Sequence, residues 1–116
     1  MKKAIDYQKE KVAELLGLIK KNPDLPIVPM VDSEVVGDDS YGRWMGSWGS
    51  SYVGEYIVGK EQIHYRDDED WDEIESLLSE DYGYNVWAEM DDETAKRIYM
   101  EMPWIKAIIV AIDLPD

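Results

Sequence analysis

The sequence predicts one α+β domain over residues 1–116, with an antiparallel or mixed sheet of about four to five strands. Three observations favour this fold class. Apolar residues recur at helical spacing in residues 4–21 and again between residues 70 and 102. Between them, residues 25–67 are rich in β-branched and aromatic residues with glycine turns, and residues 104–112 are almost continuously apolar. A chain of 116 residues also has the usual length of a single domain.

The first element is expected to be an amphipathic helix over residues 4–21. Its apolar residues are separated by seven, three, one and three positions, so they form one stripe, and the opposite face is charged. The stripe consists of Ile5, Val12, Leu15, Leu16 and Ile19. Pro23 disfavours helical geometry at Asn22 and cannot continue the hydrogen-bond ladder, so the helix should end near residues 20–22.

Residues 25–32 predict an edge strand or an extended connector, because Pro26 and Pro29 lack the N–H group that a central strand donates. Residues 35–67 predict three short strands, with turn signals at residues 37–40 and 59–61.

The last two of these strands should pair as an antiparallel hairpin around a turn at residues 59–61. Side chains alternate between the two faces of a strand, which places Ile63 and Tyr65 on one face and His64 on the other. We expect His64 to lie at the surface of the hairpin, without a role as an acid or a base.

Two short acidic helices should follow the hairpin. Asp70 is a candidate N-cap with Glu73 three residues later, and this helix should close near Gly83. The next helix should begin at Asp91 and end before Pro103. The apolar faces of the two helices comprise Trp71, Ile74, Leu77 and Leu78, and then Ala95, Ile98, Tyr99 and Met102. Residues 104–112 should form a strand that is buried on both faces in the middle of the sheet.

The charges are strongly acidic and segregated along the chain. The net charge is −14, from 26 acids and 12 bases. Residues 1–21 hold six lysines and three acids, whereas residues 67–95 hold thirteen acids and no base. This distribution opposes binding to nucleic acid or to an anionic membrane, which reward clustered lysine and arginine. A basic protein surface is the natural partner, although the same acidity also promotes solubility.

The candidate partner-binding residues are the acids of this stretch. They are Asp67, Asp68, Glu69, Asp70, Asp72, Glu73, Glu75, Glu80, Asp81, Asp91, Asp92 and Glu93. Asp70, Glu73 and Asp91 are weaker evidence for a partner, because capping a helix already explains an acid at these positions.

Large aromatic residues alternate with small residues in residues 41–52, where Arg43, Trp44 and Trp48 are candidate contacts for a partner. Alternatively, the two tryptophans point to the same side of a strand and fill the core under the first helix. We favour the core for the tryptophan pair.

No catalytic residue, cofactor or metal site is expected, so the chain is predicted not to be an enzyme. Cysteine is absent, His64 is the only histidine, and the acids from residue 68 lack the glycine and the bidentate glutamate of a calcium loop. Weak, nonspecific binding of a hard cation remains open. The N-terminus has no apolar signal segment and the longest apolar run is too short to span a bilayer, which favours a cytoplasmic protein.

Three blocks, residues 25–32, 43–49 and 103–110, resemble those of small uncharacterised proteins carried on bacterial phages and other mobile elements. In size, acidity and setting the chain is also similar to anti-CRISPR proteins, which inhibit Cas nucleases. The resemblance and the charge distribution together imply an inhibitor whose helix-borne carboxylates act as a nucleic-acid mimic. It would occlude the basic channel of a Cas9-type nuclease. The alternatives are an immunity protein that neutralises a basic toxin, and a small enzyme or small-ligand-binding domain built on the Tyr/Trp/Gly-rich strands, with a pocket containing His64 or Ser47.

Overall fold

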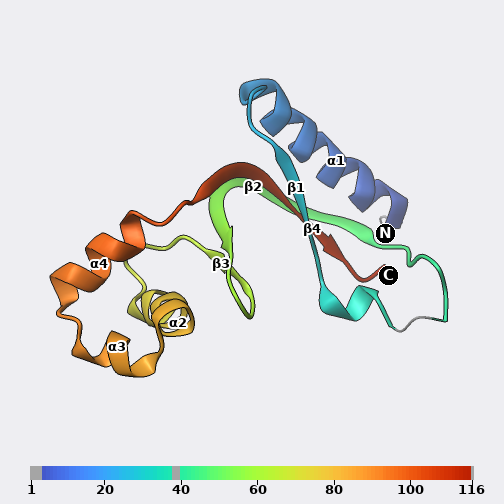
Figure 1. Cartoon of the computed structure of the whole chain (residues 1–116). Coiled ribbons are helices and arrows are strands. Elements are labelled where there is room, and N and C mark those ends of the chain that lie inside the picture. Colours follow the sequence, from blue (N-terminus) through green and yellow to red (C-terminus); the bar gives the residue numbers. More distant parts are fainter. Residues whose placement is uncertain (1–3, 38–39, 116) are drawn as a thin grey trace. The chain divides into compact units, whose positions relative to one another are not determined.

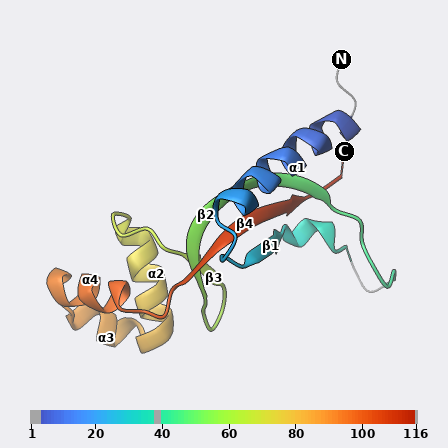
Figure 2. The same cartoon turned by 90° about the horizontal axis from the view of Figure 1, so that it is seen from above.

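Helices and a four-stranded mixed sheet make up the computed structural model, which describes residues 4–37 and 40–115 (Figures 1 and 2). In chain order the elements are α1 (Ala4–Lys21), β1 (Ile27–Val31), the 3₁₀ helix η1 (Ser33–Val35), β2 (Ser47–Val58), β3 (Ile63–Tyr65), α2 (Trp71–Tyr82), α3 (Tyr84–Glu89), α4 (Asp92–Met100) and β4 (Ile105–Asp113). The strands lie in the order β1-β4-β2-β3, with β1 parallel to β4 and β3 antiparallel to β2. The predicted α+β class is confirmed.

The described chain divides into two compact units. The first unit lies within residues 1–53 and 107–116, and the second consists of residues 54–106. Both boundaries fall inside strands, so β2 and β4 contribute residues to both units. Each unit has a hydrophobic core of its own, and the single domain over residues 1–116 stays a prediction.

Helix α1 covers one face of the sheet in the first unit (Figure 1). Leu15, Leu18 and Ile19 pack in the cluster that contains Ile108 and Val110 of β4. The predicted bounds of the helix are confirmed.

One member of the predicted stripe does not join this core. The side chain of Leu16 is 51% exposed. Successive helical residues are rotated by about 100°, so Leu16 points to the flank of a helix whose Leu15 faces the sheet. Leu18 packs against the core instead. The side chain of Ile5 lies outside the described residues.

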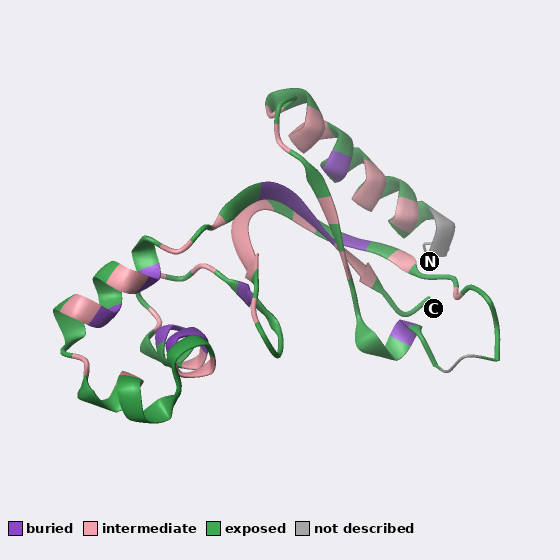
Figure 3. Ribbon diagram, viewed as in Figure 1, coloured by how far each residue is buried: buried purple, intermediate pink, exposed green. Residues whose placement is uncertain are grey.

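Strand β1 is an edge strand, as Pro26 before it and Pro29 within it predict, and β4 lies between β1 and β2 as expected. The parallel register places Ile27 beside Ile108 and Val31 beside Ile112. Residues 107–110 of β4 are all buried (Figure 3), whereas Ile105 and Lys106 at the start of the strand are exposed, so the predicted burial on both faces holds only for the middle of the strand.

The prediction of three strands in residues 35–67 is wrong for the described part of this range, which contains two. Residues 47–58 form the single long strand β2, and no strand precedes it after η1 in the described residues. Gly49 lies inside β2 because the backbone of β4 approaches closely: an added Cβ atom would lie 3.0 Å from the carbonyl oxygen of Ala111. Asp38 and Asp39 of the predicted turn lie outside the described residues.

The predicted antiparallel hairpin of β2 and β3 is confirmed. Val58 lies opposite Ile63 and Tyr56 opposite Tyr65, and the N–H of Gly59 donates to the carbonyl of Gln62 at 2.8 Å.

The core of the second unit lies between α2 and α4. It consists of Ile74, Leu77, Leu78, Ala95 and Tyr99 (Figure 3). Of the other residues in the predicted faces, Ile98 and Met102 are partly buried and pack against this core, whereas Trp71 does not belong to it. Trp104 closes one side of this core: its ring lies edge-on to that of Tyr99 at 5.0 Å between centroids, and its Nε1–H donates to the Tyr99 carbonyl at 2.8 Å. Tyr99 is thus the residue that joins the helical core to the following chain.

The sequence did not predict α3. Helix α2 ends at Gly83, as expected, and the φ angle of 90° at this residue turns the chain directly into α3. No residue of α3 is fully buried, although Trp87 packs against the core of the second unit, and its six residues are too few to show a helical period.

Candidate binding surface

Carboxylates fix the backbone of the acidic segment in front of α2. Asp70 is the N-cap: its Oδ1 accepts hydrogen bonds from the N–H groups of Asp72 at 3.0 Å and Glu73 at 3.4 Å. Asp67 accepts from the N–H of Glu69 at 3.2 Å through its Oδ1, and from the N–H of Asp70 at 3.3 Å through its carbonyl. The predicted cap is confirmed, and the segment is held by local bonds that give its side chains defined directions.

A surface hollow of about 350 Å³ lies at this segment. It is lined by Asp67, Glu69, Asp70, Trp71 and Asp72. The prediction that Trp71 belongs to the buried face of the helix is wrong, since its side chain is 41% exposed and forms a wall of the hollow. The sequence signal is ambiguous at this position: Trp71 precedes the buried Ile74 by three residues but is also the first residue after the cap.

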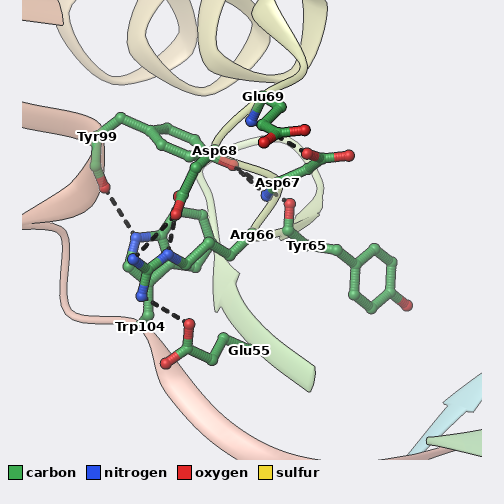
Figure 4. Close-up of polar contacts among 8 residues, drawn as sticks. All are labelled: Glu55, Tyr65, Arg66, Asp67, Asp68, Glu69, Tyr99 and Trp104. Carbon is green, nitrogen blue, oxygen red and sulfur yellow. Dashed lines mark hydrogen bonds and ion pairs between the residues drawn. The ribbon is translucent and has the colours of Figure 1, made fainter. Parts of the chain in front are cut away.

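Arg66 neutralises part of the acidic stretch (Figure 4). Its guanidinium donates to both carboxylate oxygens of Asp68, at 2.9 and 3.2 Å, and to Glu55 at 2.7 Å. The hydrogen bond to Asp68, followed by that to Glu55, holds the pKa of Arg66 above its ordinary value. Asp68 is therefore paired within the unit, and it is a weaker candidate for a partner than its neighbours.

Glu80, another acid of the predicted partner-binding set, does not lie on the surface. Its side chain is 5% exposed and contacts Nε2 of His64 at 2.5 Å, while its other oxygen accepts from the N–H of Glu61. The prediction of a surface histidine is wrong, because α2 covers the face of β3 that carries His64 and leaves it 3% exposed. The pair lies 16 residues apart and binds the hairpin to the helix.

The pKa of the Glu80 carboxyl is expected to lie below its ordinary value of 4.5. The N–H of Glu61 lowers this pKa most, burial opposes the change, and His64 lowers it further. Glu80 thus contributes stability that is fully present above about pH 4.5 and is lost as the pH falls through the lowered pKa. The measurement is the pH titration of the Glu80 carboxyl carbon by NMR. A midpoint at or above 4.5 contradicts the prediction, and His64→Ala should raise the midpoint.

The remaining acids of α2 differ in their pairing. Asp72, Glu73 and Glu75 are exposed. Asp81 lies 4.0 Å from the ammonium group of Lys60, which also donates to the Asp81 carbonyl at 3.1 Å. The acids near the start of α2 are therefore better placed for a partner than Asp81.

Asp91 begins α4 as predicted. Its Oδ1 accepts from the N–H of Thr94 at 2.7 Å, and the hydroxyl and N–H of Thr94 hold the pKa of Asp91 below its ordinary value. Asp92 and Glu93 follow in the first turn of the helix and are exposed. These acids do not line the hollow in front of α2.

The predicted core role of the tryptophan pair is wrong. Trp44 precedes β2, and its ring lies 4.6 Å from that of Tyr41, whereas Trp48 is 43% exposed at the start of β2. Arg43 is exposed. Gln8 of α1 holds the backbone of Trp48 by accepting from its N–H at 2.7 Å and donating to its carbonyl at 3.2 Å. No local pattern could reveal this contact, which joins residues 40 positions apart.

Both residues proposed for a ligand pocket have side-chain partners within the chain. His64 is buried against Glu80, and the hydroxyl of Ser47 accepts from Gln8 at 2.6 Å. Within residues 4–37 and 40–115, no group of three or more His, Asp or Glu side chains is arranged to hold a metal ion. The helices of the same residues include none that is long and apolar enough to cross a membrane.

Comparison with known proteins found no relative of the chain: no protein-family model, curated protein or solved structure matches it.

Proposed function

We propose that the chain is an acidic inhibitor that binds a basic, nucleic-acid-binding surface of another protein and blocks it. A Cas9-type nuclease, whose nucleic-acid channel is lined by lysine and arginine, is the partner class of choice. The observation that carries the proposal is the group of exposed carboxylates around the hollow at the start of α2.

The charge of the second unit supports this proposal. Its 53 residues hold sixteen acids and five lysines or arginines, so it carries eleven of the fourteen net negative charges of the chain. A like-charged surface of this kind costs stability through repulsion, and it accelerates and strengthens association with a basic partner.

The hollow has the chemistry to receive one basic side chain. Asp67, Glu69 and Asp72 supply carboxylates, and the exposed indole of Trp71 supplies an aromatic surface. A guanidinium or ammonium group gains charge-assisted hydrogen bonds from these carboxylates and a cation–π contact from the indole.

The exposed face of α2 can imitate part of a nucleic-acid backbone. Asp72 and Glu75 are three residues apart, which corresponds to about 4.5 Å along a helix axis. Phosphates along one DNA strand are separated by about 3.4 Å of axis. Binding of this face to a groove that tracks phosphates would exclude the nucleic acid by occlusion.

The test is binding of the chain to a purified Cas9-type nuclease, measured by calorimetry from about 0.05 to about 0.5 M salt. The affinity should fall steeply with salt. The variant Asp67→Asn, Glu69→Gln, Asp72→Asn, Glu75→Gln should raise Kd about tenfold or more at low salt, because four exposed carboxylates contact the basic groove.

The matched control removes the same charge elsewhere. Asp24→Asn, Glu34→Gln, Glu89→Gln, Glu101→Gln changes four exposed acids that do not line the hollow and should change Kd much less. Equal weakening by both variants would show that net charge, and not this surface, determines binding. Undiminished binding by the first variant would reject the proposed surface.

A further inference from the structure

A second surface of different chemistry lies in the first unit. A groove of about 450 Å³ runs between α1 and the start of β2 and is lined by Gln8, Lys9, Val12, Ala13, Leu16 and Trp48. Single exposed apolar residues are common on protein surfaces. Here, however, two large ones, Leu16 and Trp48, come from elements far apart in the sequence and line the same groove.

The groove exists because the apolar stripe of α1 is wider than the face that the sheet covers. Leu15 faces the sheet, and Leu16 is rotated from it by about 100°. On the helix, Lys9 and Ala13 lie on the same flank as Leu16, since Ala13 follows Lys9 by four residues and Leu16 follows Ala13 by three. This flank therefore has no partner within the described core of the first unit.

The other wall of the groove is held in place. Both backbone groups of Trp48 are bonded to the side-chain amide of Gln8, whose nitrogen also donates to Ser47. The indole is consequently presented from a backbone position that is tied to α1. A preformed wall of this kind lowers the entropy cost of binding.

The charge of the groove is opposite to that of the chain. Its one charged lining residue is Lys9, whose side chain is exposed, although the net charge of the protein is −14. We propose that this groove binds an amphipathic helix of a partner protein that carries acidic residues beside its apolar face. The apolar residues would contact Leu16 and Trp48, and a carboxylate would pair with Lys9.

The dimensions of the groove favour a helix as the occupant. Its lining follows α1 from residue 8 to residue 16, which corresponds to about 12 Å or roughly two helical turns. The groove is open along the surface, so a small molecule would leave much of its area in water, whereas a helix extends beyond both ends. This surface is independent of the acidic surface around α2, and either proposal can fail alone.

The test uses the full chain, labelled with ¹⁵N, and two synthetic helical peptides of about 14 residues. Both peptides carry leucines at i, i+3, i+4 and i+7; one is flanked by glutamates and the other by lysines. Saturable binding of the acidic peptide should shift the amide signals of residues 8–16 and 47–48. Lys9→Glu should raise its Kd about fivefold and Leu16→Ser about tenfold. Lys20→Glu, on the same helix but outside the groove, should have little effect.

Three results would overturn the proposal. In the first, binding of the acidic peptide to the wild-type chain does not saturate. In the second, the peptide binds Lys9→Glu and Leu16→Ser as tightly as it binds the wild type. In the third, sedimentation shows a dimer that Leu16→Ser dissociates, which assigns the groove to a second copy of the chain. Because Lys9 and Leu16 lie on the exposed flank of α1, both variants are expected to fold, and their amide spectra verify this.

Discussion

The His64→Ala variant should lower the free energy of unfolding by about 1.5 to 3 kcal/mol, because it removes a hydrogen-bond partner of a buried carboxylate. The side chains of His64 and Glu80 are 2% and 5% exposed. After the substitution, Glu80 keeps the hydrogen bond from the N–H of Glu61 but loses the imidazole contact. The measurement is urea-induced unfolding followed by circular dichroism at pH 7.

A surface ion pair on the same hairpin provides the control. Lys60 and Asp81 are 66% and 42% exposed, so Lys60→Ala should cost less than about 1 kcal/mol. A double variant, His64→Leu with Glu80→Met, removes both polar groups and should be more stable than His64→Ala, because no unpaired charge stays buried. If His64→Ala is no more destabilising than Lys60→Ala, the pair does not hold the hairpin against α2.

This pair also shows where prediction from the sequence ends. Alternation along β3 correctly separates His64 from Ile63 and Tyr65, but it does not say which face becomes buried. That choice depends on α2, which brings Glu80 to the hairpin from 16 residues away. Features with a local cause were predicted well: the edge position of β1, the caps Asp70 and Asp91, and the bounds of α1.

The acidic surface was predicted only in part for the same reason. Counting acids locates the charged stretch, but charge alone does not reveal that Arg66 pairs with Asp68 or that Glu80 is buried. The burial of Glu80 depends on how β3 and α2 pack, whereas Arg66 pairs locally with Asp68 but lies just outside the stretch in which the acids are counted. The sequence likewise gives no indication that Trp48 is held at the surface by Gln8, because the bond joins two elements that no periodicity relates.

The second large effect is expected at Tyr99, whose side chain is fully buried. Tyr99→Ala should lower the free energy of unfolding by about 3 to 5 kcal/mol, as large-to-small substitutions of buried aromatic residues do. The ring packs in the core with Ile74, Leu78 and Ala95 and lies edge-on to Trp104. Urea unfolding measures the loss, and Tyr82→Ala, on the exposed end of α2, should cost far less.

The variant Tyr99→Phe keeps the packing of the ring and removes only its hydroxyl. It therefore tests the hydrogen bonds through which this core residue contacts the acidic segment. The Tyr99 hydroxyl accepts from the N–H of Asp67 at 2.9 Å and donates to the carbonyl of Tyr65 at 3.4 Å (Figure 4). Its loss should cost about 1 to 3 kcal/mol, because it leaves the Asp67 N–H without this acceptor. Hydrogen exchange at the Asp67 amide should accelerate more than the global loss of stability explains. Unchanged exchange would show that the hydroxyl does not anchor the segment.

Faster exchange would mean that a buried core residue fixes the backbone of Asp67, the first acid of the proposed binding surface. Tyr99→Phe should then also weaken partner binding without changing any charge.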